Sequence, residues 1–321
     1  MSETGEARHT SPRHALVTGA TGALGPVLVQ TLISEGWTVR ALCRSAPQKD
    51  ALPARVEIRL GDITDENAVA GAVDGVGTVF HLAGLLHNPR PRAADVPRYE
   101  EVNVLGTRHV ARSAATAGAS VIFFSTIALY GATMGEGVDE SSPVKPKGPY
   151  ALSKWRGEQV LLSMGPEATV LRLAAVYGRR IKGNYQRLVD AMRRGRFVPI
   201  GNGENRRTLV HEEDAIRAAI LAADRVHEVR GLYNVTDGTT HTMREILAAI
   251  AAALGRPESR LRVPEVLARF GARAVGYEDV VDKYLENVEV KGDLIQKALG
   301  FSPRFNLADG WRHALRAPEP A

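Results

Sequence analysis

The chain has a single cysteine, Cys43, among its 321 residues, so it cannot form an internal disulfide bond. A disulfide-stabilised secreted scaffold is therefore excluded, and one thiol is typical of a reducing compartment. The sequence has no apolar run near the roughly 20 residues that cross a bilayer. Residues 1–13 are polar and resemble a disordered tail rather than a signal peptide. We therefore expect a cytoplasmic protein without a membrane-spanning segment.

Aromatic residues are scarce, at 6% of the chain, and no block of lysine and arginine has aromatic residues interleaved with it. The formal net charge of +5 would suit nucleic acid, but the basic residues are scattered along the sequence. We therefore expect no nucleic-acid partner. Scattered arginines fit either a solvated surface or a ligand that carries phosphate.

Short apolar segments alternate with segments of helical periodicity in the first half of the chain. The expected strands are residues 15–18, 38–43, 56–60, 76–81, 120–125 and 170–173. The expected helices are 27–35, 68–73, 103–117 and one that starts near Tyr150. Strands and helices in alternation, with crossover-sized spacing, predict an α/β fold of the Rossmann type, with a doubly wound parallel sheet.

The pattern changes beyond residue 178. Further helices are expected at 184–194, 214–223 and 243–254, with a strand at 231–235, and the last third is helical and irregular. We expect a dinucleotide-binding domain over 14–178, and we expect the chain to return to this domain near residues 205–240. An interleaved, smaller and mostly helical substrate-binding domain is expected over 179–321.

A glycine-rich turn, Thr18-Gly-Ala-Thr-Gly-Ala-Leu-Gly25, follows the first expected strand and opens a helix. Glycines let the backbone approach a pyrophosphate, which then lies at the N-terminus of the helix. Many glycine-rich turns are only tight connections, but the strand–turn–helix context favours a dinucleotide. The predicted contacts are Gly19, Thr21, Gly22, Ala23, Leu24 and Gly25.

The end of the second strand bears on the choice of cofactor. An acidic residue there would bind the ribose hydroxyls and repel a 2′-phosphate, but this chain has Cys43 followed by Arg44. A guanidinium suits a phosphate, so NADP(H) is favoured and NAD(H) stays possible. Arg44 could instead be a surface residue that stacks on adenine.

Further cofactor contacts are predicted after the third and fourth strands. Asp62 could accept from the adenine amine or could cap the next helix. Small residues after His81 allow close approach of the cofactor, and Asn103 could join a helix to a strand, order water, or be a buried, satisfied amide. The predicted contacts are Asp62, Ile63, Leu82, Ala83, Gly84 and Asn103.

Tyr150 and Lys154 are four residues apart on an expected helix and therefore share one face. A free tyrosine has a pKa of about 10. A nearby ammonium favours the phenolate, so we expect Lys154 to lower the pKa of Tyr150. Thr126 supplies a hydroxyl that can hold a substrate oxygen beside the phenol. This set predicts hydride transfer to or from a carbon that bears oxygen.

These motifs occur in one order that resembles the extended short-chain dehydrogenase/reductase family, from about residue 14 to residue 315. The resemblance implies that Tyr150 is the acid/base and that Thr126 is the catalytic hydroxyl. It also implies that Lys154 lowers the pKa of Tyr150 and holds the nicotinamide ribose. The motifs are Thr18–Gly25, Asp62-Ile63, His81–Gly84, Asn103–Thr107, Phe124–Thr126 with Tyr130-Gly131, and Tyr150–Lys154.

The C-terminal half resembles NAD(P)-dependent nucleotide-sugar enzymes of that family, in particular bacterial UDP-sugar 4-epimerases and 4-ketoreductases. The motifs are Arg172–Gly178, Lys182–Tyr185, Pro199–Gly201 and Asn205–His211. The resemblance implies a UDP- or dTDP-linked sugar as partner, no metal ion, and a cofactor contact at Tyr177. The implied substrate contacts are Ser125, Thr126, Asn184 and Arg207, and Arg207 would pair with the diphosphate or instead form a surface salt bridge.

Two departures from the family pattern bear on the reaction. Ala175 stands where UDP-galactose 4-epimerases usually have asparagine. Ile127 and Ala128 follow Thr126 where 4,6-dehydratases have Asp-Glu, and neither can exchange a proton. We therefore do not expect dehydration by that mechanism.

Four functions stay open. The first is a reductase or dehydrogenase at C4 of a nucleotide-linked sugar, and the second is a 4-epimerase that retains NAD. The third is a reductase of a hydrophobic ketone or alcohol, whose pocket residues 264–277 could line. The fourth is a non-catalytic cofactor sensor, although such proteins typically lose the tyrosine or the lysine. The resemblance also implies a homodimer formed through the helices at 103–117 and 150–162.

Overall fold

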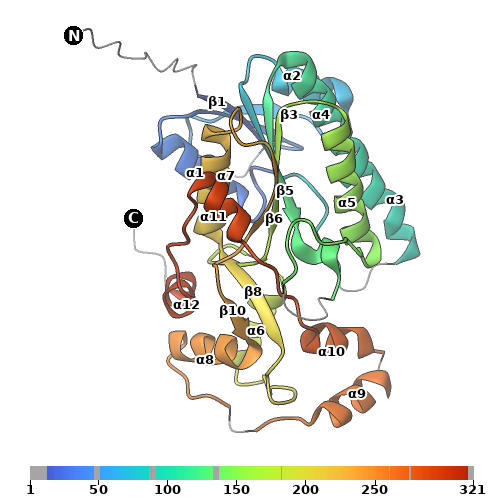
Figure 1. Ribbon diagram of the computed structural model, residues 1–321, viewed down its shortest axis with the longest axis vertical. Helices are drawn as coiled ribbons and strands as arrows, with labels where there is room; N and C mark the ends of the chain where they lie inside the picture. Colours follow the sequence, from blue (N-terminus) through green and yellow to red (C-terminus); the bar gives the residue numbers. More distant parts are fainter. Residues whose placement is uncertain are drawn as a thin grey trace, which may run out of the picture.

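The computed structural model describes residues 13–46, 51–86, 88, 92–132, 137–181, 183–259, 261–274 and 276–316. Residues 1–12 of the expected tail, and Lys182, lie outside the described residues. A seven-stranded sheet, all parallel, has the order β3-β2-β1-β4-β5-β6-β9 (Figure 1). Its strands are β1 (His14–Thr18), β2 (Thr38–Cys43), β3 (Glu57–Leu60), β4 (Thr78–His81), β5 (Ser120–Thr126), β6 (Ala168–Leu173) and β9 (Gly231–Val235). The predicted α/β fold with a parallel sheet is confirmed.

Helices cover both faces of this sheet (Figure 1). One side carries α1 (Gly25–Ser34), α7 (Glu212–Asp224) and α11 (Asp293–Leu299), and the other carries α2 (Glu66–Val73), α4 (Gly106–Ala117) and α5 (Gly148–Ser163). The central strands β5 and β6 are almost fully buried because side chains on both of their faces meet helices. This burial explains why their sequences are nearly continuous apolar runs.

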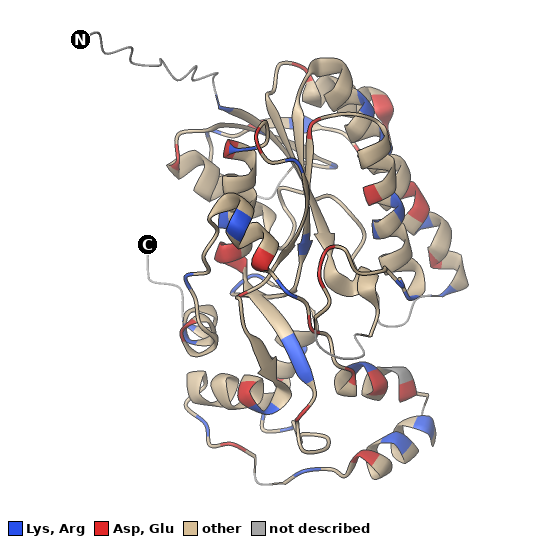
Figure 2. Ribbon diagram, viewed as in Figure 1, with Lys and Arg blue, Asp and Glu red and all other residues tan. Residues whose placement is uncertain are grey.

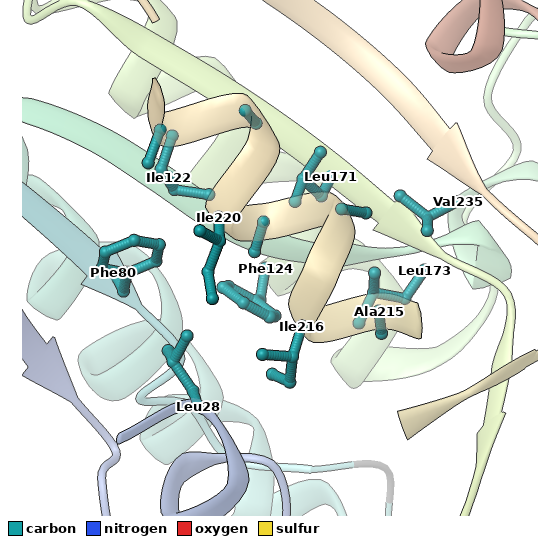
Figure 3. Packing of buried hydrophobic residues seen from close by; sticks show 14 of the residues in the cluster. Leu28, Phe80, Ile122, Phe124, Leu171, Leu173, Ala215, Ile216, Ile220 and Val235 are labelled. Carbon is teal, nitrogen blue, oxygen red and sulfur yellow. The ribbon is translucent and has the colours of Figure 1, made fainter. Parts of the chain in front are cut away.

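Alternate side chains of each strand form two separate cores. Phe80, Ile122 and Phe124 pack against Leu28 of α1 and Ile216 of α7 (Figure 3). Their neighbours on the strands face α2, α4 and α5 on the opposite side. Burying each large apolar side chain contributes about 1.5–3 kcal/mol, so these two layers hold the strand ends in place.

A second, three-stranded sheet has the order β10-β8-β7, with β7 (Ala175–Tyr177), β8 (Arg206–His211) and β10 (Thr240–Thr242). Its core includes Tyr177, Leu209, Ile246 and Trp311. The surrounding helices are α6 (Asn184–Arg193), α8 (Met243–Ala253) and α12 (Leu307–Leu315). Residues 175–177, which we expected within the dinucleotide-binding part, thus pair with β8 rather than with the large sheet.

Two helices, α9 (Glu265–Ala274) and α10 (Glu278–Leu285), lie at the end of the molecule away from α2 (Figure 1). Helix α9 exposes Val266, Leu267 and Phe270, with Phe270 78% exposed. Both charge signs are mixed along this pair of helices (Figure 2). No helix in the described part of the chain combines the length and apolar character that a membrane span requires.

The remaining short elements follow β4 and β5 in the chain. They are η1 (Ala93–Asp95), α3 (Val96–Tyr99), η2 (Glu100–Leu105) and η3 (Ile127–Tyr130). The helix expected over 103–117 therefore starts as the widened turn η2, a π-helix, before α4 begins. Such widened turns often mark functional sites.

Candidate active site

The candidate site lies where the parallel strands of the large sheet end. Gly19 follows β1, Arg44 follows β2, Asp62 follows β3, Gly84 follows β4, and Thr126 closes β5. Because the strands are parallel, their carboxyl ends share one edge of the sheet. The connections reverse direction between β1 and β4, which is the place where doubly wound sheets bind ligands.

The glycine-rich turn fits a pyrophosphate. A Cβ atom at Gly25 would lie 2.3 Å from the carbonyl oxygen of Ala20, and one at Gly19 would lie 2.8 Å from the amide nitrogen of Ala83. Leu24, at the N-cap of α1, cannot accept from the first turn, so the free N–H groups there suit a phosphate. The other predicted contacts in the turn are exposed or half-buried: Thr21, Gly22 and Ala23.

Asp62 and Arg44 lie close together at the ends of β3 and β2. Asp62 Oδ1 accepts from the amide and the hydroxyl of Thr64, at 3.0 and 2.9 Å. Burial would raise the pKa of Asp62, but these hydrogen bonds and the charge of Arg44 outweigh burial and lower it. Asp65 caps α2, so the alternative that Asp62 is the cap is wrong. Arg44 is exposed at this edge, whereas Cys43 is buried.

A buried chain of hydrogen bonds joins β1 and β4 to α4. Thr107 donates to the carbonyl of Asn103 at 2.7 Å and therefore accepts from His81 Nε2 at 3.0 Å. The hydroxyl of Thr18 then donates to His81 Nδ1 at 2.8 Å. Burial, with the charge of Lys154, lowers the pKa of His81 to about 3, so this imidazole is neutral.

Asn103 continues this chain to the helix that carries Tyr150. Its Oδ1 accepts from the amide of Leu85 at 2.7 Å, and its Nδ2 donates to the hydroxyl of Ser153 at 2.9 Å. Ser153 in turn donates to the carbonyl of Tyr150 at 2.9 Å. The Asn103 side chain is buried and fully used, so it joins β4 to α5 and is not the cofactor contact that we predicted.

The other contacts predicted near β4 divide into two groups. The side chain of Ile63 is buried against Gly106, so it is a core residue rather than a surface for adenine. The half-buried Leu82, Ala83 and Gly84 line the edge of the sheet beside the glycine-rich turn. The close approach of a cofactor to these residues stays a prediction.

Tyr150 and Thr126 meet at the end of β5. The Thr126 hydroxyl accepts from the amide of Ala128 at 3.2 Å, which leaves its proton free for the phenol oxygen of Tyr150. Burial raises the pKa of Tyr150 to about 12, and the hydrogen bond from Thr126 opposes this shift. The two hydroxyl groups thus adjoin one another, as the sequence predicted.

The pKa of Tyr150 lies above its ordinary value in this structure, and the lowering effect expected of Lys154 stays a prediction. Burial dominates at both residues: it raises the pKa of Tyr150 and lowers the pKa of Lys154 to about 7. The ammonium of Lys154 lies 3.9 Å from the ring centre of Phe123. Lys154 is therefore an amine that gains or loses its proton near neutral pH, and Glu158 opposes the loss.

Ser125 is buried and points away from the predicted substrate position. Its hydroxyl donates to Glu158 Oε1 at 2.5 Å, and Glu158 also accepts from Arg172 Nη2 at 2.7 Å. The predicted substrate contact at Ser125 is therefore wrong. Sequence reasoning missed Glu158 and the role of Arg172, although Glu158 is eight residues after Tyr150 on one helix face.

Tyr177 is also a core residue. Its ring is 1% exposed and stacks on Trp311 with ring centres 4.6 Å apart. A Cβ atom at Gly310 would lie 2.0 Å from its hydroxyl. Its side chain thus holds α12 against the small sheet, and the predicted cofactor contact there is wrong.

Asn184 and Arg207 lie on the first turn of α6 and on β8. Asn184 is exposed at the first turn of α6. Burial raises the pKa of its neighbour Tyr185, and the guanidinium of Arg207 is close enough to oppose this rise. Arg207 donates to the carbonyls of Lys283 and Tyr284 at the end of α10. It therefore does not form the surface salt bridge that was the alternative.

We expected no metal ion, but three possible ligands do gather at the start of α7. Ligand atoms of His211, Glu213 and His313 lie within 4.8 Å of one another. His211 Nδ1 accepts from the amide of Glu213 at 3.2 Å, so its proton is on Nε2. His313 Nδ1 accepts that proton at 3.2 Å, so the two imidazoles are hydrogen-bonded to each other.

Comparison with known proteins adds to this geometry. Residues 15–236 match the model of the NAD dependent epimerase/dehydratase family. The chain belongs to this family. It is 27% identical over 320 residues to a UDP-glucose 4-epimerase of Vibrio cholerae, with 95% of each chain covered. It is 30% identical over 340 residues to a 4-hydroxy-2-methyl-3-oxo-4-farnesyl-3,4-dihydroquinoline-1-oxide ketoreductase of Stigmatella aurantiaca, with 95% and 96% covered.

A solved structure, MoeE5 in complex with UDP-glucuronic acid and NAD, superimposes with a TM-score of 0.75. The identity is 27%, with 94% of this chain and 97% of that chain covered. The family is one of nicotinamide-dependent enzymes that act on nucleotide sugars, and this chain is an enzyme of that family. The glycine-rich turn is the part of the site that would hold the dinucleotide pyrophosphate.

Proposed function

We propose that this protein is an NAD(P)-dependent oxidoreductase that acts at C4 of a nucleotide-linked sugar, as a 4-ketoreductase or dehydrogenase. The observation that carries the proposal is the contact between the hydroxyls of Tyr150 and Thr126 at the end of β5. The contact lies on the same edge of the sheet as the glycine-rich turn. Two hydroxyls at that edge can hold one substrate oxygen while a proton moves.

The dinucleotide, when bound, supplies or accepts the hydride. In the reducing direction Tyr150 gives its phenolic proton to the substrate oxygen, and Thr126 donates a second hydrogen bond to it. The ammonium of Lys154 then offsets the negative charge on the phenolate. In the oxidising direction Tyr150 takes the proton back. Because burial lowers the pKa of Lys154 to about 7, this help is largest at and below neutral pH.

A 4-epimerase that retains NAD is the second candidate reaction, supported by the similarity to the Vibrio cholerae epimerase along nearly the whole chain. The Stigmatella ketoreductase supports net reduction to a similar degree. Product analysis separates the two reactions. A reductase oxidises one NAD(P)H for each sugar reduced, whereas an epimerase interconverts two UDP-hexoses without net change in reduced nicotinamide.

For the cofactor we propose a preference for NADP(H), because Arg44 is an exposed guanidinium at the end of β2 and the acid typical of NAD-binding sites is missing. NAD(H) is the alternative, and MoeE5 holds NAD. If the proposal is correct, Arg44→Gln raises the KM for NADPH roughly tenfold and leaves the KM for NADH unchanged. Better use of NADH than NADPH by the unaltered protein contradicts the preference.

The proposed substrate is a UDP- or dTDP-linked sugar held between Asn184 and Arg207. Tyr185, the residue after Asn184, lies close enough to Arg207 to interact with its charge, so an aromatic ring and a cation are together there for a nucleoside diphosphate. Calorimetry with UDP alone tests this. Binding that is weakened by Arg207→Gln supports the proposal, and no heat at millimolar UDP contradicts it.

A hydrophobic ketone or alcohol is the second candidate substrate. The exposed apolar side chains of α9 favour it, and the name of the Stigmatella relative includes a farnesyl group. Absence of UDP binding together with turnover of a prenylated ketone is the expected result for this candidate.

We also propose that two chains associate through α4 and α5, which lie side by side at the surface of the large sheet. Leu162 of α5 is 47% exposed on this surface. Light scattering is expected to give twice the chain mass, and Leu162→Asp is expected to give the mass of one chain.

A further inference from the structure

Three ionisable residues follow one line along α5. Tyr150, Lys154 and Glu158 are spaced by four residues each, which places them on one face of the helix. Lys154 is 5% exposed and Glu158 is fully buried. A buried carboxylate is costly unless its charge is balanced and its oxygens are hydrogen-bonded.

Glu158 is bonded from two strands. Arg172 of β6 donates to it from Nε at 3.1 Å and from Nη2 at 2.7 Å. Ser125 of β5 donates at 2.5 Å, and the next residue on that strand is Thr126. Glu158 therefore joins the helix that carries Tyr150 to the strand that carries Thr126.

We propose that Glu158 is a positioning residue for the proton-transfer pair: it fixes Thr126 against Tyr150 and supplies the negative charge that keeps the buried Lys154 amine protonated. This inference rests on the proposed roles of Tyr150 and Lys154. It goes beyond them because Glu158 is fully buried and would act through its neighbours.

The groups around Lys154 show why this charge matters. His81 of β4 is neutral because burial lowers its pKa, and Phe123 offers only a ring face. Arg172 is a second buried cation close by, and its other nitrogen donates to the hydroxyl of Tyr130 at 2.8 Å. Among the described neighbours, Glu158 is thus the carboxylate that favours the charged amine, and it opposes the effect of burial.

The sign of the expected effect follows. Without the Glu158 charge, the pKa of Lys154 falls further below its ordinary value. The amine then loses its proton at a lower pH. Activity that needs the ammonium therefore declines at a lower pH on the alkaline side of the pH profile. An opposite charge at close range shifts a pKa by about one to three units.

The test compares Glu158→Gln with Glu158→Gln/Arg172→Met, because the single variant leaves a buried arginine unpaired and the double variant removes that cost. The first readout is the pKa of Lys154 from NMR titration of isotope-labelled lysine in the protein without substrate. The second is the alkaline limb of the pH profile of kcat/KM. Glu100→Gln is the matched control, since Glu100 pairs with Arg156 in an exposed ion pair beside the same helix.

We expect Glu158→Gln to lower the pKa of Lys154 by about one unit or more and to move the alkaline limb to lower pH by the same amount. The double variant also loses the cation of Arg172, so it is expected to regain thermal stability and to show a smaller shift of the same sign. A pKa of Lys154 and a pH profile that are unaltered in Glu158→Gln overturn the inference and leave a structural ion pair. The NMR readout does not depend on the reaction, so an active Tyr150→Phe variant would count against the proposed function alone.

Discussion

Helix α5 buries charged side chains, whereas helix α9 exposes apolar ones. On α5, Lys154 and Glu158 are enclosed and every polar contact of Glu158 is made within the protein. On α9, Val266 and Phe270 are more than three-quarters exposed. The buried charge of Glu158 is balanced by hydrogen bonds from Ser125 and Arg172, and burial at α5 lowers the pKa of Lys154. The exposed apolar surface of α9 contributes little to folding.

The largest expected effect contrasts two glycines. In Gly25→Ala the new Cβ would lie 2.3–2.4 Å from three backbone atoms of the turn, so the turn must distort, costing about 3 kcal/mol or more and most of the dinucleotide affinity. In Gly271→Ala, within α9, the new Cβ meets nothing within 4 Å, and stability is expected to rise by about 0.5–1 kcal/mol. Denaturant unfolding and dinucleotide titration measure both. Equal changes in the free energy of unfolding for Gly25→Ala and Gly271→Ala would contradict the difference in packing between the glycine-rich turn and α9.

A second contrast uses truncation to alanine in each helix. Leu161→Ala removes a fully buried side chain of α5 and is expected to cost about 2–5 kcal/mol. Phe270→Ala removes an exposed side chain of α9 and is expected to change stability by less than about 0.5 kcal/mol. Urea unfolding tests the pair, and a loss above about 2 kcal/mol for Phe270→Ala would mean that α9 is buried in solution.

A smaller effect comes from acid. His81 has its pKa lowered to about 3, while an unfolded histidine titrates near 6.5. Between pH 6.5 and 3 the unfolded chain therefore binds a proton at His81 that the folded chain does not bind. The contribution of the neutral His81 to the free energy of unfolding is fully present above pH 6.5 and is lost as the pH falls toward 3. The expected loss from His81 is about 1.5 kcal/mol between pH 6.5 and 5. In His81→Gln the free energy of unfolding should depend less steeply on pH over this range, and an unchanged slope would contradict the neutral, buried imidazole.

The elements that the sequence predicted are those with strong local signals. Residues 38–43 and 231–235 are strands with the expected bounds, because each is a short run that is buried on both sides. Strand β8 begins with Arg206 and Arg207, which have no apolar pattern, and it was not predicted. Its pairing with β7 and β10 depends on contacts that lie far apart in the sequence.

The sequence predicts which site residues lie close together where they share one helix or follow directly from the order of the strands. Tyr150 and Lys154 lie on one helix face for that reason, and Thr126 meets Tyr150 because β5 ends beside α5. Burial could not be read from the sequence, and burial decides the rest. It raises the pKa of Tyr150, lowers that of Lys154, and turns Ser125 toward Glu158.

The central claim is that the phenol of Tyr150 moves the proton that accompanies hydride transfer. The most direct test is Tyr150→Phe, which removes one oxygen and keeps the ring. We expect kcat to fall about 10²- to 10⁴-fold while dinucleotide binding and thermal stability stay unchanged. Turnover within about threefold of the unaltered protein, under the same conditions, would contradict the claim.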